Sequence, residues 1–128
     1  MLTYAIEDEY TARAEYEVIM DKYGAIRPFT NISRAESEHI SLLTPLFAEY
    51  GLTVPENEAA SHVTVPATLN ESYAAGVEAE VKNIAMYERF LDENLPDDVR
   101  TVFENLQAAS ENHLQAFERS ADRTAGWR

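Results

Sequence analysis

Residues 29–50 read FTNISRAESEHISLLTPLFAEY, and this stretch decides the fold. Its apolar residues recur at alternating steps of three and four, the spacing that places side chains on one face of an α-helix. That face is apolar at both ends, from Phe29 to Ile32 and from Leu43 to Tyr50, but its middle holds Glu36 and His39. A plain helical core is apolar throughout, so the acid and the imidazole need a separate explanation.

Three further segments repeat this pattern of apolar ends around a polar middle. Each has about 20 residues, enough for about 30 Å of helix. Their stripes are Leu2, Ile6, Glu9, Ala12, Tyr16, Met20 and Tyr23; Leu69, Tyr73, Val77, Glu80, Ile84, Tyr87 and Leu91; and Val99, Phe103, Leu106, Ser110, His113 and Phe117. Four such helices would bring their polar residues together at the middle of one bundle.

Glycine and proline divide the chain into helices at about 2–23, 29–50, 70–94 and 97–120, within a domain of residues 1–120 followed by a C-terminal tail, 121–128. Short joints make each neighbouring pair an antiparallel hairpin. The connection 52–70 is long enough to run the whole length of the bundle. The sequence therefore predicts an all-α, four-helix bundle in which one long crossover joins two helical hairpins, the connectivity of ferritin-like bundles.

Composition excludes several classes of function. The 128 residues include 23 Asp and Glu against 10 Lys and Arg, a net charge of -13, and no cysteine. Disulfides, thiolate zinc sites, cysteine nucleophiles and iron–sulfur clusters are therefore excluded. The negative charge predicts that neither nucleic acid nor an anionic membrane is a partner. No apolar run reaches the length of a membrane span, and the N-terminus lacks the features of a signal peptide, so we expect a cytoplasmic protein.

The polar middle predicts a metal site. Buried carboxylates without a counter-charge are strongly unfavourable, and a divalent ion is an economical compensation. Oxygen and imidazole nitrogen are ligands of iron, manganese and zinc. In Glu36-x-x-His39 the two residues are three apart, about 5–6 Å on one helix face, so both can hold one ion. Ser110-x-x-His113 repeats this spacing. A core histidine, or a metal-free polar layer that sets helix register, is the alternative interpretation.

A tyrosine follows each of two glutamates by seven residues, on the same helix face. The pairs are Glu9 with Tyr16 and Glu80 with Tyr87. These tyrosines fit either core aromatics or hydrogen-bond donors to the carboxylates. Glu7, Asp8 and Glu15 flank the stripe and are expected on a solvated face.

The chain resembles the ferritin-like superfamily of di-iron carboxylate proteins, especially the rubrerythrins. EDEYTARAEY is similar to the first-helix motif of rubrerythrins, with a ligand Glu followed by Ala-Arg and Tyr. A closer resemblance is to a ferritin-like family of uncharacterised function. Its patterns lie here at Ile6 to Tyr16, Phe29 to His39, Gly76 to Glu80 and Ser110 to Phe117.

This resemblance implies two divalent transition metal ions, iron foremost, with manganese or zinc as alternatives. Glu9 and His39 would be terminal ligands of one ion and Glu80 and His113 of the other, with Glu36 as the bridge. Tyr16 and Tyr87 would donate hydrogen bonds to the carboxylates. Ser110 stands where a second bridging glutamate is expected in rubrerythrins, which predicts weaker binding at the Glu80–His113 half.

The implied activity is that of an oxidoreductase acting on oxygen or peroxide. Rubrerythrins commonly carry a cysteine-rich electron-entry module, and this chain has no cysteine, so a redox partner would have to supply electrons. Metal binding without turnover and a metal-free helical interaction module are the alternatives, and a homodimer is compatible with each of them.

Overall fold

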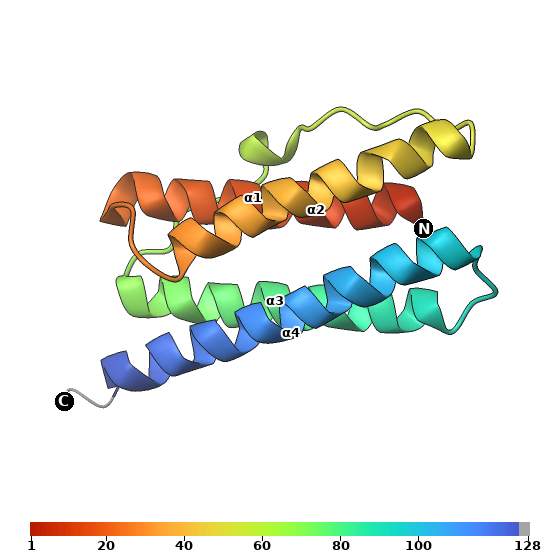
Figure 1. The fold of residues 1–128 in the computed structure, drawn as a ribbon. Coiled ribbons are helices and arrows are strands. Elements are labelled where there is room, and N and C mark those ends of the chain that lie inside the picture. Colours follow the sequence, from red (N-terminus) through yellow and green to blue (C-terminus); the bar gives the residue numbers. More distant parts are fainter. Residues whose placement is uncertain (126–128) are drawn as a thin grey trace.

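The computed structural model describes residues 1–125. They form four α-helices and no strand: α1 (Leu2–Tyr23), α2 (Phe29–Glu49), α3 (Leu69–Leu91) and α4 (Asp97–Ala125), with one short 3₁₀ turn, η1 (Ala59–Ser61). The hairpin of α1 and α2 packs on the hairpin of α3 and α4 (Figure 1). The predicted four-helix bundle is confirmed.

The crossover between α2 and α3 runs back along the outside of the first hairpin (Figure 1). Side chains of α1 hold it there. Tyr10 Oη donates a hydrogen bond to the Pro55 carbonyl at 3.2 Å, and Tyr23 Oη donates to the Pro66 carbonyl at 2.8 Å. Because these two contacts lie at opposite ends of the connection, the long loop has a fixed course.

The sequence predicts α3 at about 70–94, whereas the structure has it at Leu69–Leu91, so the helix ends earlier than predicted. Local hydrogen bonds are found at both of its ends. Thr68 caps its N-terminus, because the Thr68 hydroxyl accepts from the Glu71 N–H at 3.1 Å while the Glu71 carboxylate accepts from the Ala67 N–H at 3.1 Å. At the other end, Arg100 of α4 donates to the carbonyls of Leu91 and Glu93. These bonds satisfy carbonyls at the helix end, so α3 stops at Leu91.

The prediction of a tail at 121–128 is wrong for its described part. Helix α4 continues to Ala125 instead of ending near Ser120. Ser120 is buried, and Ala121 packs against the apolar cluster at this end of the bundle, so the packed face of the helix is longer than the apolar stripe indicated. Residues 126–128 lie outside the described part of the chain.

Two apolar clusters fill the two halves of the bundle, and the polar residues of each stripe lie between them. One cluster contains Ile6, Leu43, Phe47, Tyr87, Phe103 and Leu106. The other contains Tyr16, Ile19, Phe29, Ile32, Tyr73 and Phe117. Each helix contributes to both clusters. The apolar ends of the stripes therefore pack on both sides of a polar layer at the middle of the bundle.

Within residues 1–125, no helix combines the length and the apolar character that a membrane span requires.

Gly76 allows α3 and α4 to pack closely. A Cβ atom at this position would lie 2.7 Å from the ring of Phe117, which is fully buried. Alanine normally favours a helix over glycine by about 1 kcal/mol. Here the clash should reverse that preference, because a buried ring cannot move without disturbing its neighbours.

We therefore expect Gly76→Ala to lower the free energy of unfolding by about 1–3 kcal/mol, measured by urea denaturation. Phe117→Leu provides the matched background, because a smaller side chain makes room for the new methyl group. In a double-mutant cycle the alanine should be less costly in that background. Equal costs in both backgrounds would contradict the predicted contact.

Candidate metal centre

Each helix contributes at least one acid or imidazole to the polar layer. Glu9 comes from α1, Glu36 and His39 from α2, Glu80 from α3 and His113 from α4. Their potential ligand atoms form two groups in which all atoms lie within 4.8 Å of one another: Glu9, Glu36 and His39, and Glu36, Glu80 and His113. The structure thus brings together all five residues that the sequence proposes as ligands.

Glu36 belongs to both groups, and each of its oxygens faces a different imidazole. Glu36 Oε2 lies 3.6 Å from His39 Nδ1, and Glu36 Oε1 lies 3.4 Å from His113 Nδ1. The same imidazole nitrogens approach the outer acids: His39 Nδ1 lies 3.2 Å from Glu9 Oε2, and His113 Nδ1 lies 3.4 Å from Glu80 Oε1. Glu36 is therefore placed as a bridge between two similar halves.

The three carboxylates of this centre are shielded from water. The exposed fraction is 0% for Glu9 and 1% for both Glu36 and Glu80. A buried carboxylate needs hydrogen bonds, a proton or a cation to offset the loss of hydration. In the layer described here, the two imidazoles supply the only nearby groups that can carry positive charge.

Two tyrosines donate hydrogen bonds across the hairpin boundary. Tyr16 of the first hairpin donates to Glu80 Oε2 of the second at 2.5 Å, and Tyr87 of the second donates to Glu9 Oε1 of the first at 2.8 Å. Burial and the nearby glutamates raise the pKa of both phenols well above 10, so they stay protonated. Each tyrosine occupies one oxygen of its glutamate and leaves the other directed toward an imidazole.

Two atoms of the second half are buried and lack a hydrogen-bond partner within residues 1–125. They are Glu80 Oε1 and His113 Nδ1, which face each other at 3.4 Å. Buried polar atoms in native proteins are nearly always satisfied, so this pair is unusual within the described part of the chain.

Comparison with known proteins places the chain in a family. Residues 1–127 match the family described as an uncharacterised protein domain, DUF2202. The chain belongs to this family. A relative, the uncharacterised protein MJ0754 of Methanocaldococcus jannaschii, is 26% identical over 128 residues, covering 88% of this chain and 69% of the relative.

A solved structure shares the fold of this DUF2202 chain. The crystal structure of the hypothetical protein MJ0754 from Methanococcus jannaschii superposes with a TM-score of 0.87 at 23% identity, covering 97% of this chain and 79% of that one. At this identity the likeness concerns the fold alone.

Sequence reasoning missed one buried residue of the layer in this DUF2202 chain, Asn83. Its side chain is 3% exposed and lies beside Ser110, whose hydroxyl donates to Asn83 Oδ1 at 2.5 Å. Asn83 follows Glu80 by three residues, the spacing that singled out Glu36 and His39. The same three-residue spacing, counted from Glu80 on α3, identifies Asn83. Ser110 thus contacts an amide from α3 at the position where the rubrerythrin resemblance expects a carboxylate.

Asp8 does not lie on a fully solvated face, contrary to the expectation from its position beside the stripe. Asp8 Oδ2 accepts a hydrogen bond from Asn83 Nδ2 at 2.6 Å. Burial, together with the charges of Glu9 and Glu80, raises the pKa of Asp8 to about 6, although the bond from Asn83 acts in the opposite direction. Asp8 is therefore connected to the polar layer, which the stripe pattern of α1 did not indicate.

The protonation of the ligand-free layer follows from its burial. Burial and the Glu36 charge raise the pKa of Glu9 to about 8, so Glu9 holds a proton. Burial would raise the pKa of Glu36 as well, but the proton of Glu9 and the close imidazoles of His113 and His39 outweigh it and lower that pKa. Burial lowers the pKa of the imidazoles, yet the close carboxylates of the glutamates raise it to about 10 for His39 and about 9 for His113.

These shifts predict that the metal-free protein loses stability as the pH rises. The ordinary pKa of histidine, 6.5, applies to the unfolded chain, so the native state holds more protons above that pH. The imidazole contribution is complete below pH 6.5 and is lost as the pH passes through about 9 and 10. Glu9 acts in the same direction between pH 4.5 and about 8.

Urea midpoints of the chelator-treated protein should therefore fall between about pH 6.5 and 9. His39→Gln should flatten this dependence, because it removes the group with the larger imidazole shift. A midpoint that stays constant or rises over this range would contradict the assigned protonation.

Proposed function

We propose that this protein is a ferritin-like di-metal protein that binds two divalent transition metal ions, iron foremost, in the polar layer. The observation that carries the proposal is the buried pair Glu80 Oε1 and His113 Nδ1, which lacks hydrogen-bond partners within residues 1–125. An ion between these atoms and Glu36 Oε1 would satisfy all three and would replace the imidazole proton as the positive charge of this half.

The donor set fits such ions. One site would use Glu9 Oε2, Glu36 Oε2 and His39 Nδ1, and the other would use Glu36 Oε1, Glu80 Oε1 and His113 Nδ1. Mixed carboxylate and imidazole ligands suit iron, manganese and zinc. The tyrosines fix the outer glutamates so that one oxygen of each points inward. With three protein ligands each, both sites leave positions for small molecules.

The finer proposal is an oxidoreductase that acts on oxygen or peroxide. Two iron ions in this position would exchange electrons with such a molecule. The chain supports that chemistry in two ways: the apolar clusters on both sides of the layer limit the access of water, and the protonated phenols hold the ligand carboxylates. Electrons would come from a redox partner, because no cysteine-based centre lies in this chain.

Anaerobic titration with ferrous ion, followed by elemental analysis, tests the metal-binding proposal. We expect two ions per chain. Glu80→Gln should weaken the binding of one ion by 10-fold or more, because it removes a ligand charge. Glu78→Gln is the matched control, since Glu78 lies two residues away on α3, is exposed and pairs with Lys82. Absence of binding, or equal effects of both variants, would contradict the proposal.

Oxidation of the ferrous form by peroxide, in excess of the rate without protein, tests the oxidoreductase activity separately.

Removal of the metal should lower stability. An ion that binds only the native state adds about 2.7 kcal/mol at a hundredfold excess over its dissociation constant. We therefore expect a chelator to lower the melting temperature by several degrees at neutral pH. An unchanged melting temperature, with metal loss verified by elemental analysis, would favour the metal-free interaction module.

A further prediction concerns Ser110. Because serine supplies no charge, we expect the Glu80–His113 half to bind its ion more weakly than the Glu9–His39 half. Ser110→Glu should strengthen this weaker site, and manganous ion titrated into both proteins measures the change. Ser110→Gln, of similar size and neutral, separates the effect of charge from that of packing. If the natural protein has two equally tight sites and Ser110→Glu does not change them, a fourth carboxylate among the ligands is unnecessary.

A further inference from the structure

The proposed centre lacks one negative charge. Two divalent ions need four carboxylates for neutrality, whereas the five ligands include only Glu9, Glu36 and Glu80. In an interior shielded from water, an uncompensated charge weakens ion binding considerably. A further anionic group close to the ligands would therefore have a large effect on affinity.

Asn83 connects such a group to the centre. Its Nδ2 atom donates to Asp8 Oδ2 at 2.6 Å and lies 3.4 Å from Glu9 Oε1. The orientation of this amide follows from its neighbours: the ionised Asp8 carboxylate only accepts hydrogen bonds, and Glu9 Oε1 already acts as the acceptor of the Tyr87 bond. The Ser110 hydroxyl, in contrast, can donate to Asn83 Oδ1. The amide group thus holds two carboxylates of α1 side by side, one of them a ligand.

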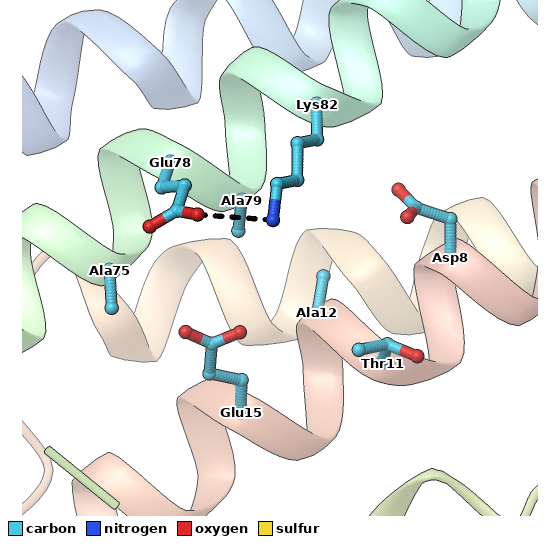
Figure 2. A pocket seen from close by; sticks show the side chains of 8 residues that line it. All are labelled: Asp8, Thr11, Ala12, Glu15, Ala75, Glu78, Ala79 and Lys82. Atoms are coloured by element: carbon cyan, nitrogen blue, oxygen red, sulfur yellow. Dashed lines mark ion pairs between the residues drawn. The ribbon is translucent and has the colours of Figure 1, made fainter. Parts of the chain in front are cut away.

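Asp8 forms no salt bridge within residues 1–125, although the nearby charge of Lys82 favours its ionised form. It lines a groove of about 220 Å³ between α1 and α3, together with Glu15 and Lys82 (Figure 2). Lys82 pairs with Glu78 at 3.0 Å, on the same helix. In the described part of the chain, Asp8 forms no ion pair of its own, and its hydrogen bond leads inward to Asn83.

We propose that Asp8, held by Asn83, is the fourth carboxylate of the centre, a counter-charge beside the ligands that replaces the acid missing at Ser110. This inference rests on the proposed binding of two ions. It gives the serine a second role: Ser110 orients Asn83, and Asn83 positions Asp8. The fourth negative charge is thus carried by a side chain of α1 that α3 holds in place, and not by a side chain of α4.

Calorimetric titration with manganous ion tests this role in the full chain. Asp8→Asn keeps the shape of the side chain and removes its charge. We expect the affinity for the second ion to fall by about 10- to 100-fold, the usual effect of losing a partner of a ligand. Glu15→Gln removes a charge from the same groove without a bond to Asn83, and its effect should stay below about threefold. Circular dichroism of each variant establishes that the bundle is folded.

Two further variants separate charge from structure. Asp8→Glu retains the charge and should recover most of the affinity lost in Asp8→Asn. Ser110→Glu, combined with Asp8→Asn, places a carboxylate on α4 and should also recover it. If the natural protein binds two ions and Asp8→Asn behaves like Glu15→Gln, the role of Asp8 is refuted while the metal centre stands. If the natural protein binds no ion, both proposals fail together.

Discussion

The structure depends on how three buried carboxylates are compensated at mid-height in the bundle. Glu9, Glu36 and Glu80 are almost fully shielded from water. Without a metal, protons and two imidazoles provide the compensation, which is why the pKa of His39 and that of His113 lie far above the ordinary value. Protons therefore offset part of the negative charge of this layer. Any ion that enters must displace protons, so metal affinity and pH are linked.

The same layer dictates how the hairpins pair. Tyr16 and Tyr87 each reach the glutamate of the opposite hairpin, so both bonds form only in one register of the two hairpins. The burial of apolar surface is non-directional, whereas a hydrogen bond requires a defined distance and angle. The crossed tyrosine bonds add a positional requirement that the clusters above and below the layer do not impose.

Much of the fold and of the layer was accessible from the sequence, because periodicity and spacing record them directly. Helix number, the hairpins, the crossover and the convergence of Glu9, Glu36, His39, Glu80 and His113 follow from residues on one stripe of each helix. Asp8 could not be found in this way, since it lies off the stripe of α1 and its role depends on a contact with α3. The end of α4 was missed for a similar reason: small residues such as Ala121 pack without marking an apolar stripe.

The crossover has a consequence for how the two halves can diverge. An assembly of two identical hairpins would carry every substitution twice, so a serine in one ligand position would also appear in the other. Because a single chain joins the hairpins, each half can change alone: α2 keeps Glu36 beside its histidine, while α4 has Ser110 and α3 supplies Asn83. Covalent linkage thus gives the molecule two non-equivalent halves within a nearly twofold architecture, and permits one half to specialise while the other maintains the bundle.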